Sequence, residues 1–152
     1  MEREPPVIFL RFLRFYQVPG TWAERRHHVD IIIPEQIDFL RSGPYQFASA
    51  VLHHGDSTQS GHYTAWCWEG IAKGKNRYRW YNDNEVGDIC TWEQVTSSTR
   101  ANARLYAGVY IVIYTRIGFW SDEVGDGTEA TPYRRDAAST QVAHAHFRGE
   151  AR

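Results

Sequence analysis

Residues 60–68 read SGHYTAWCW and residues 78–82 read YRWYN. Both runs are rich in aromatic and β-branched side chains, which favour β-strands. The segment between them carries Gly70, Gly74 and Asn76, residue types that are common in turns. The two runs therefore predict an antiparallel β-hairpin over residues 62–82.

The predicted hairpin places a histidine beside an asparagine. If the strands fold about a centre near Ala72, His62 at the start of one strand lies opposite Asn82 at the end of the other. Directly opposed residues have Cβ atoms about 4.5–5.5 Å apart, so an amide oxygen can accept a hydrogen bond from the imidazole. A histidine oriented by an asparagine or aspartate is the base half of a cysteine-nucleophile triad. The pair is a candidate site, although such pairs also arise as incidental contacts in surface hairpins.

The rest of the chain up to about residue 116 adds more strands around this hairpin. Thr91 with Gln94 three residues later has the pattern of a capping box, and it predicts a short helix over Trp92–Val95. The fold class is expected to be α+β and mostly antiparallel β. Further strands are predicted over Val7–Phe15, His28–Ile33, Tyr45–His54 and Ala107–Tyr114, with a helical turn over Glu35–Leu40.

No segment of the sequence predicts a substantial helical layer over this sheet. A twisted antiparallel sheet needs a second layer to cover its apolar face, so the chain is expected to be part of a larger fold. Residues 117–152 turn to Gly, Ala, Ser, Thr and mixed charge, and they are predicted to be mostly disordered, with a short helix near Asp136–Phe147 as an alternative. The expected organisation is a domain portion at 1–116 and a tail at 117–152.

Composition excludes several classes of protein. The 152 residues are 42% hydrophobic and 23% charged, near globular averages, and the net charge of -1 argues against a nucleic-acid partner. No run is long enough for a membrane span, and the N-terminus lacks a signal peptide, so no membrane partner is expected. Two cysteines cannot build a disulfide scaffold. The expected location is intracellular, in the cytoplasm, the nucleus or both.

Four segments together resemble a known family. They read YQFASAVLHHG at 45–55, SGHYTA at 60–65, WYNDNEV at 80–86 and VYIVIY at 109–114. In this order they are similar to the histidine box of the ubiquitin-specific proteases, which are papain-like cysteine deubiquitinases. PPVIFLRFLRF at 5–15 and VDIIIP at 29–34, with Ile37-Asp38, resemble the strands that precede that box. The resemblance covers about residues 5–116 and implies the C-terminal, palm-like half of the catalytic domain.

The resemblance also implies roles for individual residues. His62 would be the general base, Asn82 the third member of the triad, and Asp83 an acidic neighbour that supports the oxyanion and the histidine. The loop Gly55–Gly61 would be a mobile blocking loop over the ubiquitin tail, and the implied partner is ubiquitin or a ubiquitinated protein. No cofactor is implied. The residues expected to contact substrate are Gly55, Ser60, Gly61 and Tyr63.

The chain departs from the family at the nucleophile. The family's N-terminal box, Gly-x-x-Asn-x-Gly-Asn-x-Cys, is absent, as are the helical thumb and the zinc-carrying fingers. Cys67 is expected on the opposite face of the strand from His62, as a buried small hydrophobic residue. Cys90 stands just before the capped turn, a more reactive setting, but the family places no nucleophile there. The nucleophilic half is therefore expected upstream, lost from a truncated gene model, or in another chain.

Two other readings of the chain's function stay open. The first is a catalytically inactive remnant that still binds ubiquitin, and the second is a carbohydrate-binding or scaffold module. Trp66, Trp68, Trp80 and Trp92 could form a sugar-stacking platform, although aromatic residues on a sheet more often pack across strands.

The paired histidines predict no metal site. In the pairs His27-His28 and His53-His54, adjacent residues of a strand face opposite sides, so each pair offers one ligand per face. His53 is expected to be a core or loop-anchoring residue, and the other three are expected to be solvated.

Overall fold

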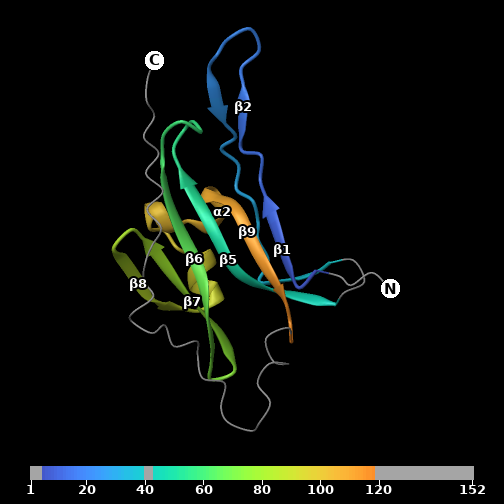
Figure 1. The fold of residues 1–152 in the computed structure, drawn as a ribbon. Helices are drawn as coiled ribbons and strands as arrows, with labels where there is room; N and C mark the ends of the chain where they lie inside the picture. The colour runs from blue at the N-terminus through green and yellow to red at the C-terminus, as the bar shows by residue number, and fades with distance from the viewer. Residues whose placement is uncertain (1–4, 40–42, 119–152) are drawn as a thin grey trace, which may run out of the picture.

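The computed structural model describes residues 5–39 and 43–118, which form a curved antiparallel sheet with short helices on one face (Figure 1). The strand order in the sheet is β1-β9-β5-β6-β7-β8, with β4 also paired to β5, while β2 and β3 form a separate hairpin. The expected α+β class, mostly antiparallel β, is confirmed. The strands are β1 (Val7–Arg11), β2 (Phe15–Gln17), β3 (Glu24–Arg26), β4 (Gln36–Asp38), β5 (Pro44–His54), β6 (His62–Ala72), β7 (Lys75–Asn82), β8 (Glu85–Cys90) and β9 (Val109–Arg116).

The hairpin of β6 and β7 is present, but its register differs from the prediction. The chain turns at Lys73 and Gly74, whose φ angles of 53° and 70° suit a tight two-residue hairpin turn. A bulge between Trp68 and Gly70 then shifts the pairing by one residue. A turn centred on Ala72 would place His62 opposite Asn82. In the structure Ala65 pairs with Tyr81, so the next position along β6, Thr64, faces Asn82.

Two segments near the start of the chain differ from the predicted elements. His28–Ile33 does not form a strand. The buried Arg14 holds this segment by donating a hydrogen bond to the Val29 carbonyl at 2.6 Å. Within the predicted helical turn at Glu35–Leu40, residues 36–38 instead form β4. Six residues bounded by Pro34 cannot bury a helical face, whereas pairing with β5 satisfies their backbone groups.

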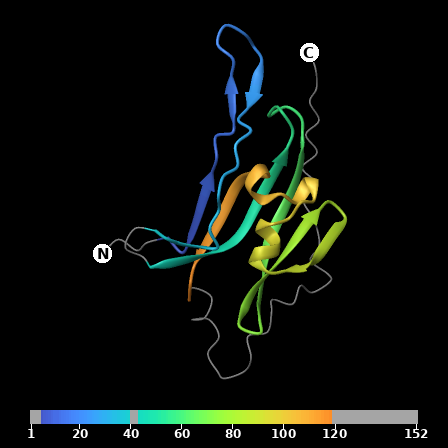
Figure 2. The same cartoon turned by 180° about the vertical axis from the view of Figure 1, so that it is seen from behind.

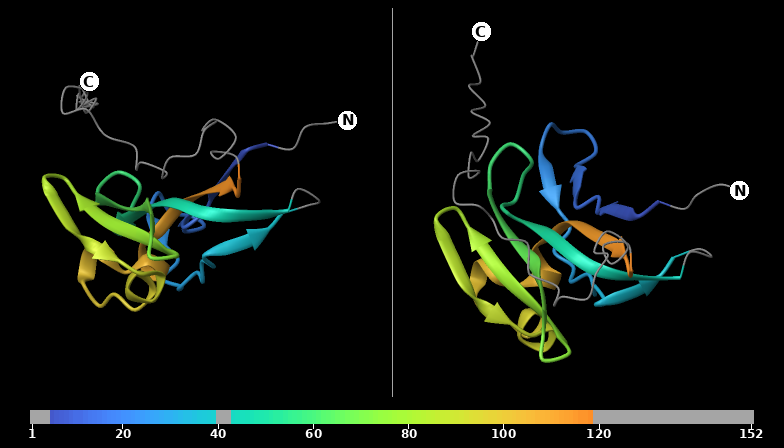
Figure 3. Two further views of the ribbon diagram at one scale, coloured as in Figure 1. Left: turned by 90° about the horizontal axis from the view of Figure 1, so that it is seen from below. Right: turned by 60° about the horizontal axis from the view of Figure 1, so that its bottom comes forward.

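One face of the sheet has a helical cover, which corrects the expectation that no segment supplies one. The cover consists of α1 (Trp92–Thr96), the 3-10 turn η1 (Ala101–Ala103) and α2 (Leu105–Gly108), seen in front of the sheet in Figure 2 and beneath it in the left view of Figure 3. The predicted capping box is present, because Thr91 and Gln94 exchange side-chain to backbone hydrogen bonds. Very short helices suffice because they are tied to the sheet by indole donors.

Two tryptophans make these ties. Trp66 Nε1 donates to the Ala103 carbonyl at 2.8 Å, and Trp80 Nε1 donates to the Asn102 carbonyl at 2.9 Å.

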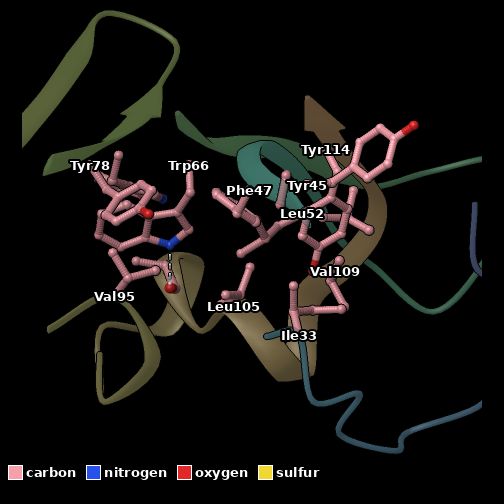
Figure 4. Close-up of a cluster of buried hydrophobic side chains, with 14 of the residues drawn as sticks. Ile33, Tyr45, Phe47, Leu52, Trp66, Tyr78, Val95, Leu105, Val109 and Tyr114 are labelled. Carbon is pink, nitrogen blue, oxygen red and sulfur yellow. Dashed lines mark hydrogen bonds between the residues drawn. The ribbon is translucent and has the colours of Figure 1, made fainter. Parts of the chain in front are cut away.

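The core lies between this cover and the sheet (Figure 4). Its fully buried side chains are Tyr45, Phe47, Leu52, Tyr78, Val95, Leu105, Val109, Val112 and Tyr114. We call this side of the sheet the helix-covered face.

The opposite side of the sheet, which we call the open face, presents a different set of side chains. Strand register places Phe9, Val51, Ala65, Ile111 and Ile113 together on it. Phe9 is 68% exposed, and the other four are half-buried. The residues that the structure describes therefore close one face of the sheet and leave the other only partly covered.

Part of the predicted tail lies outside the described residues. The disorder expected over 117–152 falls there from residue 119 onward, as does the alternative helix at Asp136–Phe147. Within residues 5–39 and 43–118, every helix is too short to cross a membrane.

Candidate active site

His62 is the first residue of β6 and follows directly after the loop at 55–61. Its side chain is 39% exposed, and its Nε2 is hydrogen bonded to Oδ1 of Asn82. An amide oxygen can only accept, so Nε2 carries the proton and Nδ1 keeps its lone pair. The arrangement leaves the imidazole with one nitrogen anchored and the other able to take a proton.

The hydrogen bond predicted between these two residues forms through a different pairing. Asn82 faces Thr64, which lies two residues beyond His62 on the same face of β6. Diagonal neighbours of this kind have Cα atoms about 7–8 Å apart, within reach of two polar side chains that lean together. The observed register differs from the expected one by two residues of β6, and a shift of two keeps a side chain on the same face of the sheet. His62 and Asn82 therefore both project from the helix-covered face and can still meet.

The asparagine is oriented from its other end. Asn82 Nδ2 donates to Oε2 of Glu85 at 3.5 Å, and the Glu85 carboxylate pairs with Arg100. The Arg100 guanidinium in turn stacks 4.3 Å from the centre of the Trp80 ring. Sequence reasoning missed Glu85 and Arg100, although the i, i+3 spacing of Asn82 and Glu85 across a tight turn could have pointed to the first.

Asp83 lies in the turn between β7 and β8. Its φ of 48° is in the left-handed region, which aspartate tolerates better than most residues. Its carboxylate Oδ2 is 3.9 Å from Nε2 of His62, and its side chain is 79% exposed. The carboxylate therefore adds negative charge beside the ring, in a position where water weakens its effect.

A second histidine stands directly across from His62. His54 pairs with it between β5 and β6, with ring centres 6.4 Å apart and nearly parallel planes. Its Nε2 bonds to the Thr64 hydroxyl at 2.8 Å, and that hydroxyl donates to the Asn102 carbonyl at 2.6 Å. Burial, and next the charge of His62, lower the pKa of His54. The prediction that His54 is solvated was wrong.

Two glycines close the neck of the loop at 55–61. A Cβ on Gly55 would lie 2.6 Å from the Ser60 carbonyl, and a Cβ on Gly61 would overlap the His53 ring. His53 is 2% exposed, packed against Phe15 and Tyr63, and burial lowers its pKa. The loop-anchoring position expected for His53 is therefore seen, and only glycine fits at the neck beside it.

The other two predicted substrate contacts lie apart from each other. Ser60 is exposed at the end of the loop, with its hydroxyl 3.3 Å from that of Ser57. Tyr63 is 52% exposed and projects from the open face, against His53, whereas His62 projects from the helix-covered face. The loop joins these two surfaces.

Neither cysteine is close to the imidazole. Cys67 lies on the open face, where its Sγ is 3.6 Å from the Ser49 hydroxyl. Cys90 pairs with Tyr78, which in turn pairs with Trp68 of β6. Trp68 is six residues from His62 along β6, so at about 3.3 Å per residue Cys90 lies level with a point about 20 Å from His62. Burial, and next the charge of Asp88, raise the pKa of Cys90, contrary to the reactive setting inferred from the capped turn.

No group of three or more His, Cys, Asp or Glu side chains gathers into a metal-binding arrangement within the described part of the chain. The two paired histidines of β5 separate onto opposite faces of the sheet, as the strand alternation requires.

Comparison with known proteins identifies the family. The family model described as ubiquitin carboxyl-terminal hydrolase matches residues 1–114. The chain belongs to the ubiquitin carboxyl-terminal hydrolase family. The resemblance inferred from the four sequence segments is thereby confirmed, and the family supports a deubiquitinating hydrolase class with ubiquitin or ubiquitinated proteins as substrates. A search among curated proteins found no match to the chain.

Proposed function

We propose that this chain supplies the base half of a thiol-dependent deubiquitinase. In this proposal His62 is the general base, Asn82 orients its ring, and the nucleophilic cysteine comes from a segment outside these 152 residues, upstream or in another chain. The reaction is hydrolysis of the isopeptide or peptide bond after the ubiquitin C-terminus, through an acyl-enzyme thioester. The domain portion is 1–116, the palm-like half of a papain-like fold.

The observation that carries the proposal is the hydrogen bond between Nε2 of His62 and Oδ1 of Asn82. It holds the tautomer in which Nδ1 has a free lone pair, the state needed to take a proton from a thiol. The Nε2–H of His62 has its acceptor in Asn82, and the Asp83 carboxylate lies 3.9 Å from the same nitrogen. Asp83 and neighbouring backbone N–H groups are proposed to steady the oxyanion.

The positions of the cysteines support an external nucleophile. The sequence has only Cys67 and Cys90. Cys67 is on the far side of the sheet from His62, and Cys90 is remote and has a raised pKa. A thiol with a raised pKa gives little thiolate at neutral pH, and thiolate is the attacking species.

The proposed substrate contacts surround the loop before His62. The neck of this loop closes tightly because Gly55 and Gly61 have no side chain, and both residues are proposed to border the ubiquitin tail. Ser60 offers a hydroxyl at the rim and Tyr63 an exposed ring, and both are proposed to contact the ubiquitin tail. Glycine is suited to this position because a Cβ at either site would meet other atoms of the neck.

A second candidate is a ubiquitin-binding remnant without catalysis. The absence of a cysteine near His62 favours it equally, since every proposed binding residue is present and the attacking sulfur is not. The two candidates differ in what happens when a cysteine-bearing half is supplied. Only the first predicts turnover.

The experiment adds a cysteine-bearing half of this family to the 152-residue chain and follows a fluorogenic ubiquitin substrate. The chain alone is expected to give no turnover and no labelling by a ubiquitin C-terminal electrophile. In the reconstituted form, His62→Ala is expected to lower the rate at least about 100-fold, as loss of a general base does. The matched control is His27→Ala, an exposed histidine whose ring centre lies 4.5 Å from that of Tyr16.

Each result assigns the function differently. Wild-type rates in reconstituted His62→Ala refute the base assignment. Labelling of Cys90 in the chain alone overturns the external nucleophile. Ubiquitin binding without turnover in the reconstituted form selects the second candidate.

A further inference from the structure

The hairpin of β2 and β3 lies beside the loop at 55–61, although the two are far apart in sequence (Figure 1; Figure 3, right). The alternate positions 24, 26 and 28 all direct their side chains at this loop or its neck. Residues at alternate positions of an extended chain share one side. One side of β3 and of the residues directly after it therefore contacts the loop at three points.

The middle contact fixes the neck. Nη1 of Arg26 donates to the His53 carbonyl at 2.7 Å and to the Gly55 carbonyl at 3.0 Å, while Nη2 donates to the Ala107 carbonyl at 3.0 Å. One guanidinium thus ties the loop's first residues to the segment before β9. The planar fork of arginine suits three carbonyls that are fixed in position.

The first contact holds the loop's tip. Oε2 of Glu24 accepts two hydrogen bonds from Thr58, one from its backbone N–H at 2.5 Å and one from its hydroxyl at 2.8 Å. Bonds to a charged acceptor are about twice as strong as neutral ones. Both residues are accessible at the surface, so this contact can open without disturbing the core.

The third contact is weaker. His28 Nε2 is 3.6 Å from Oδ1 of Asp56, and the two side chains are 72% and 89% exposed. At such exposure water screens the pair, and its contribution is small. The tip of the loop is therefore held chiefly by the two bonds to Glu24.

We propose that Glu24 is a positioning residue that latches the loop at 55–61 to the β2–β3 hairpin, through paired hydrogen bonds to Thr58. Arg26 anchors the neck, and Glu24 is the releasable contact that sets where the tip lies relative to His62. The consequence for catalysis rests on the proposed function, in which this loop borders the ubiquitin tail. The latch itself does not.

Nuclear magnetic resonance of the 152-residue chain tests the latch directly. In Glu24→Ala, the Thr58 amide proton is expected to move upfield and to exchange with solvent about tenfold faster, because its charged acceptor is gone. Glu24→Gln keeps an oxygen acceptor within reach and is expected to give an intermediate exchange rate. Glu93→Ala, which removes an exposed carboxylate in α1, is the matched control and should leave Thr58 unchanged.

A second variant separates the latch from a general loss of structure. Thr58→Val keeps the backbone N–H and loses the hydroxyl, so the residue 58 amide is expected to exchange about threefold faster. Amides in β5 and β6 should keep their exchange rates in all these variants. Unchanged shift and exchange of the Thr58 amide in Glu24→Ala would overturn the latch.

A binding measurement with ubiquitin distinguishes the latch from the proposed function. Wild-type and Glu24→Ala chains are titrated with ubiquitin, and the affinity is expected to differ between them by about threefold or more. No binding by the wild-type chain contradicts the proposed function and leaves the Thr58 result to decide the latch. If the two chains bind ubiquitin with equal affinity while the Thr58 amide exchanges faster in Glu24→Ala, the latch exists but does not affect ubiquitin binding.

Discussion

The two faces of the sheet differ in how they are closed, and the candidate site lies on the closed one. On the helix-covered face, three short helical segments bury aromatic and aliphatic side chains, and η1 accepts a hydrogen bond from Thr64, two residues from His62. On the open face, Phe9 is 68% exposed and its neighbours are half-buried. The polar side chains of the candidate site therefore project from the well-packed face, where Thr64 and Asn82 are hydrogen bonded to defined partners. The comparison teaches that packing on one face positions the imidazole.

The largest difference between the faces is expected from neighbouring aliphatic residues of β5. Leu52 is fully buried on the helix-covered face, and Val51 is half-buried on the open face. Leu52→Ala is expected to lower the free energy of unfolding by about 3 kcal/mol, because it leaves a cavity against Gly108. Val51→Ala is expected to cost about 1 kcal/mol. Urea unfolding followed by tryptophan fluorescence measures both, and equal losses would contradict the account of the two faces.

Two tryptophans of β6 give a smaller contrast. Trp66→Phe removes a buried donor and leaves the Ala103 carbonyl without it, so a loss of about 2 kcal/mol is expected. Trp68 is 38% exposed and bonds to Asn76 at the hairpin end, so Trp68→Phe is expected to cost less than about 0.5 kcal/mol. The same urea titration compares them. A larger loss at Trp68 would show that the helices depend little on the indole tie.

Stability is expected to fall as the pH drops below the ordinary histidine pKa. Burial lowers the pKa of both His53 and His54, so the unfolded chain binds protons more readily than the folded one. The free energy of unfolding therefore decreases from about pH 6.5 downward, through the lowered folded pKa values. In His54→Gln this slope should be shallower, as measured by urea midpoints at several pH values. A slope identical to wild type would show that His54 charges freely in the fold.

The smallest effect is expected at the rim of the site. The Glu85–Arg100 pair is about half exposed, so Arg100→Ala is expected to lower the free energy of unfolding by less than about 1 kcal/mol. Its informative readout is the Asn82 side-chain amide signal, which should shift because Glu85 loses its partner. Arg104→Ala, an exposed arginine in the same connection, is the control. If the Asn82 amide signal does not move, the Glu85–Arg100 ion pair does not help to orient Asn82.

Local patterns predicted the parts of the fold that depend on neighbours in sequence. The strand at Tyr45–His54 and the capping box at Thr91 were both predicted correctly, because each pattern is complete within a short window. The register of β6 and β7 was missed, since the bulge at Trp68 depends on how the strand packs. β8 was missed because Gly87 and Asp88 interrupt its strand pattern.

The candidate site was predictable only in part. The hydrogen bond between His62 and Asn82 follows from their placement at one end of a hairpin. The partners that fix it do not: Arg100 reaches Glu85 from across a connection, and His54 arrives from the next strand. Contacts between elements depend on the assembled sheet, which no single segment encodes.

The state of the His62 ring tests the central claim most directly. Long-range proton–nitrogen spectra of the 152-residue chain, recorded near neutral pH, distinguish the two tautomers of each imidazole. The account predicts that His62 carries its proton on Nε2, and that Asn82→Ala removes this preference. A His62 ring protonated on Nδ1, or one whose signals are the same in Asn82→Ala, would contradict it.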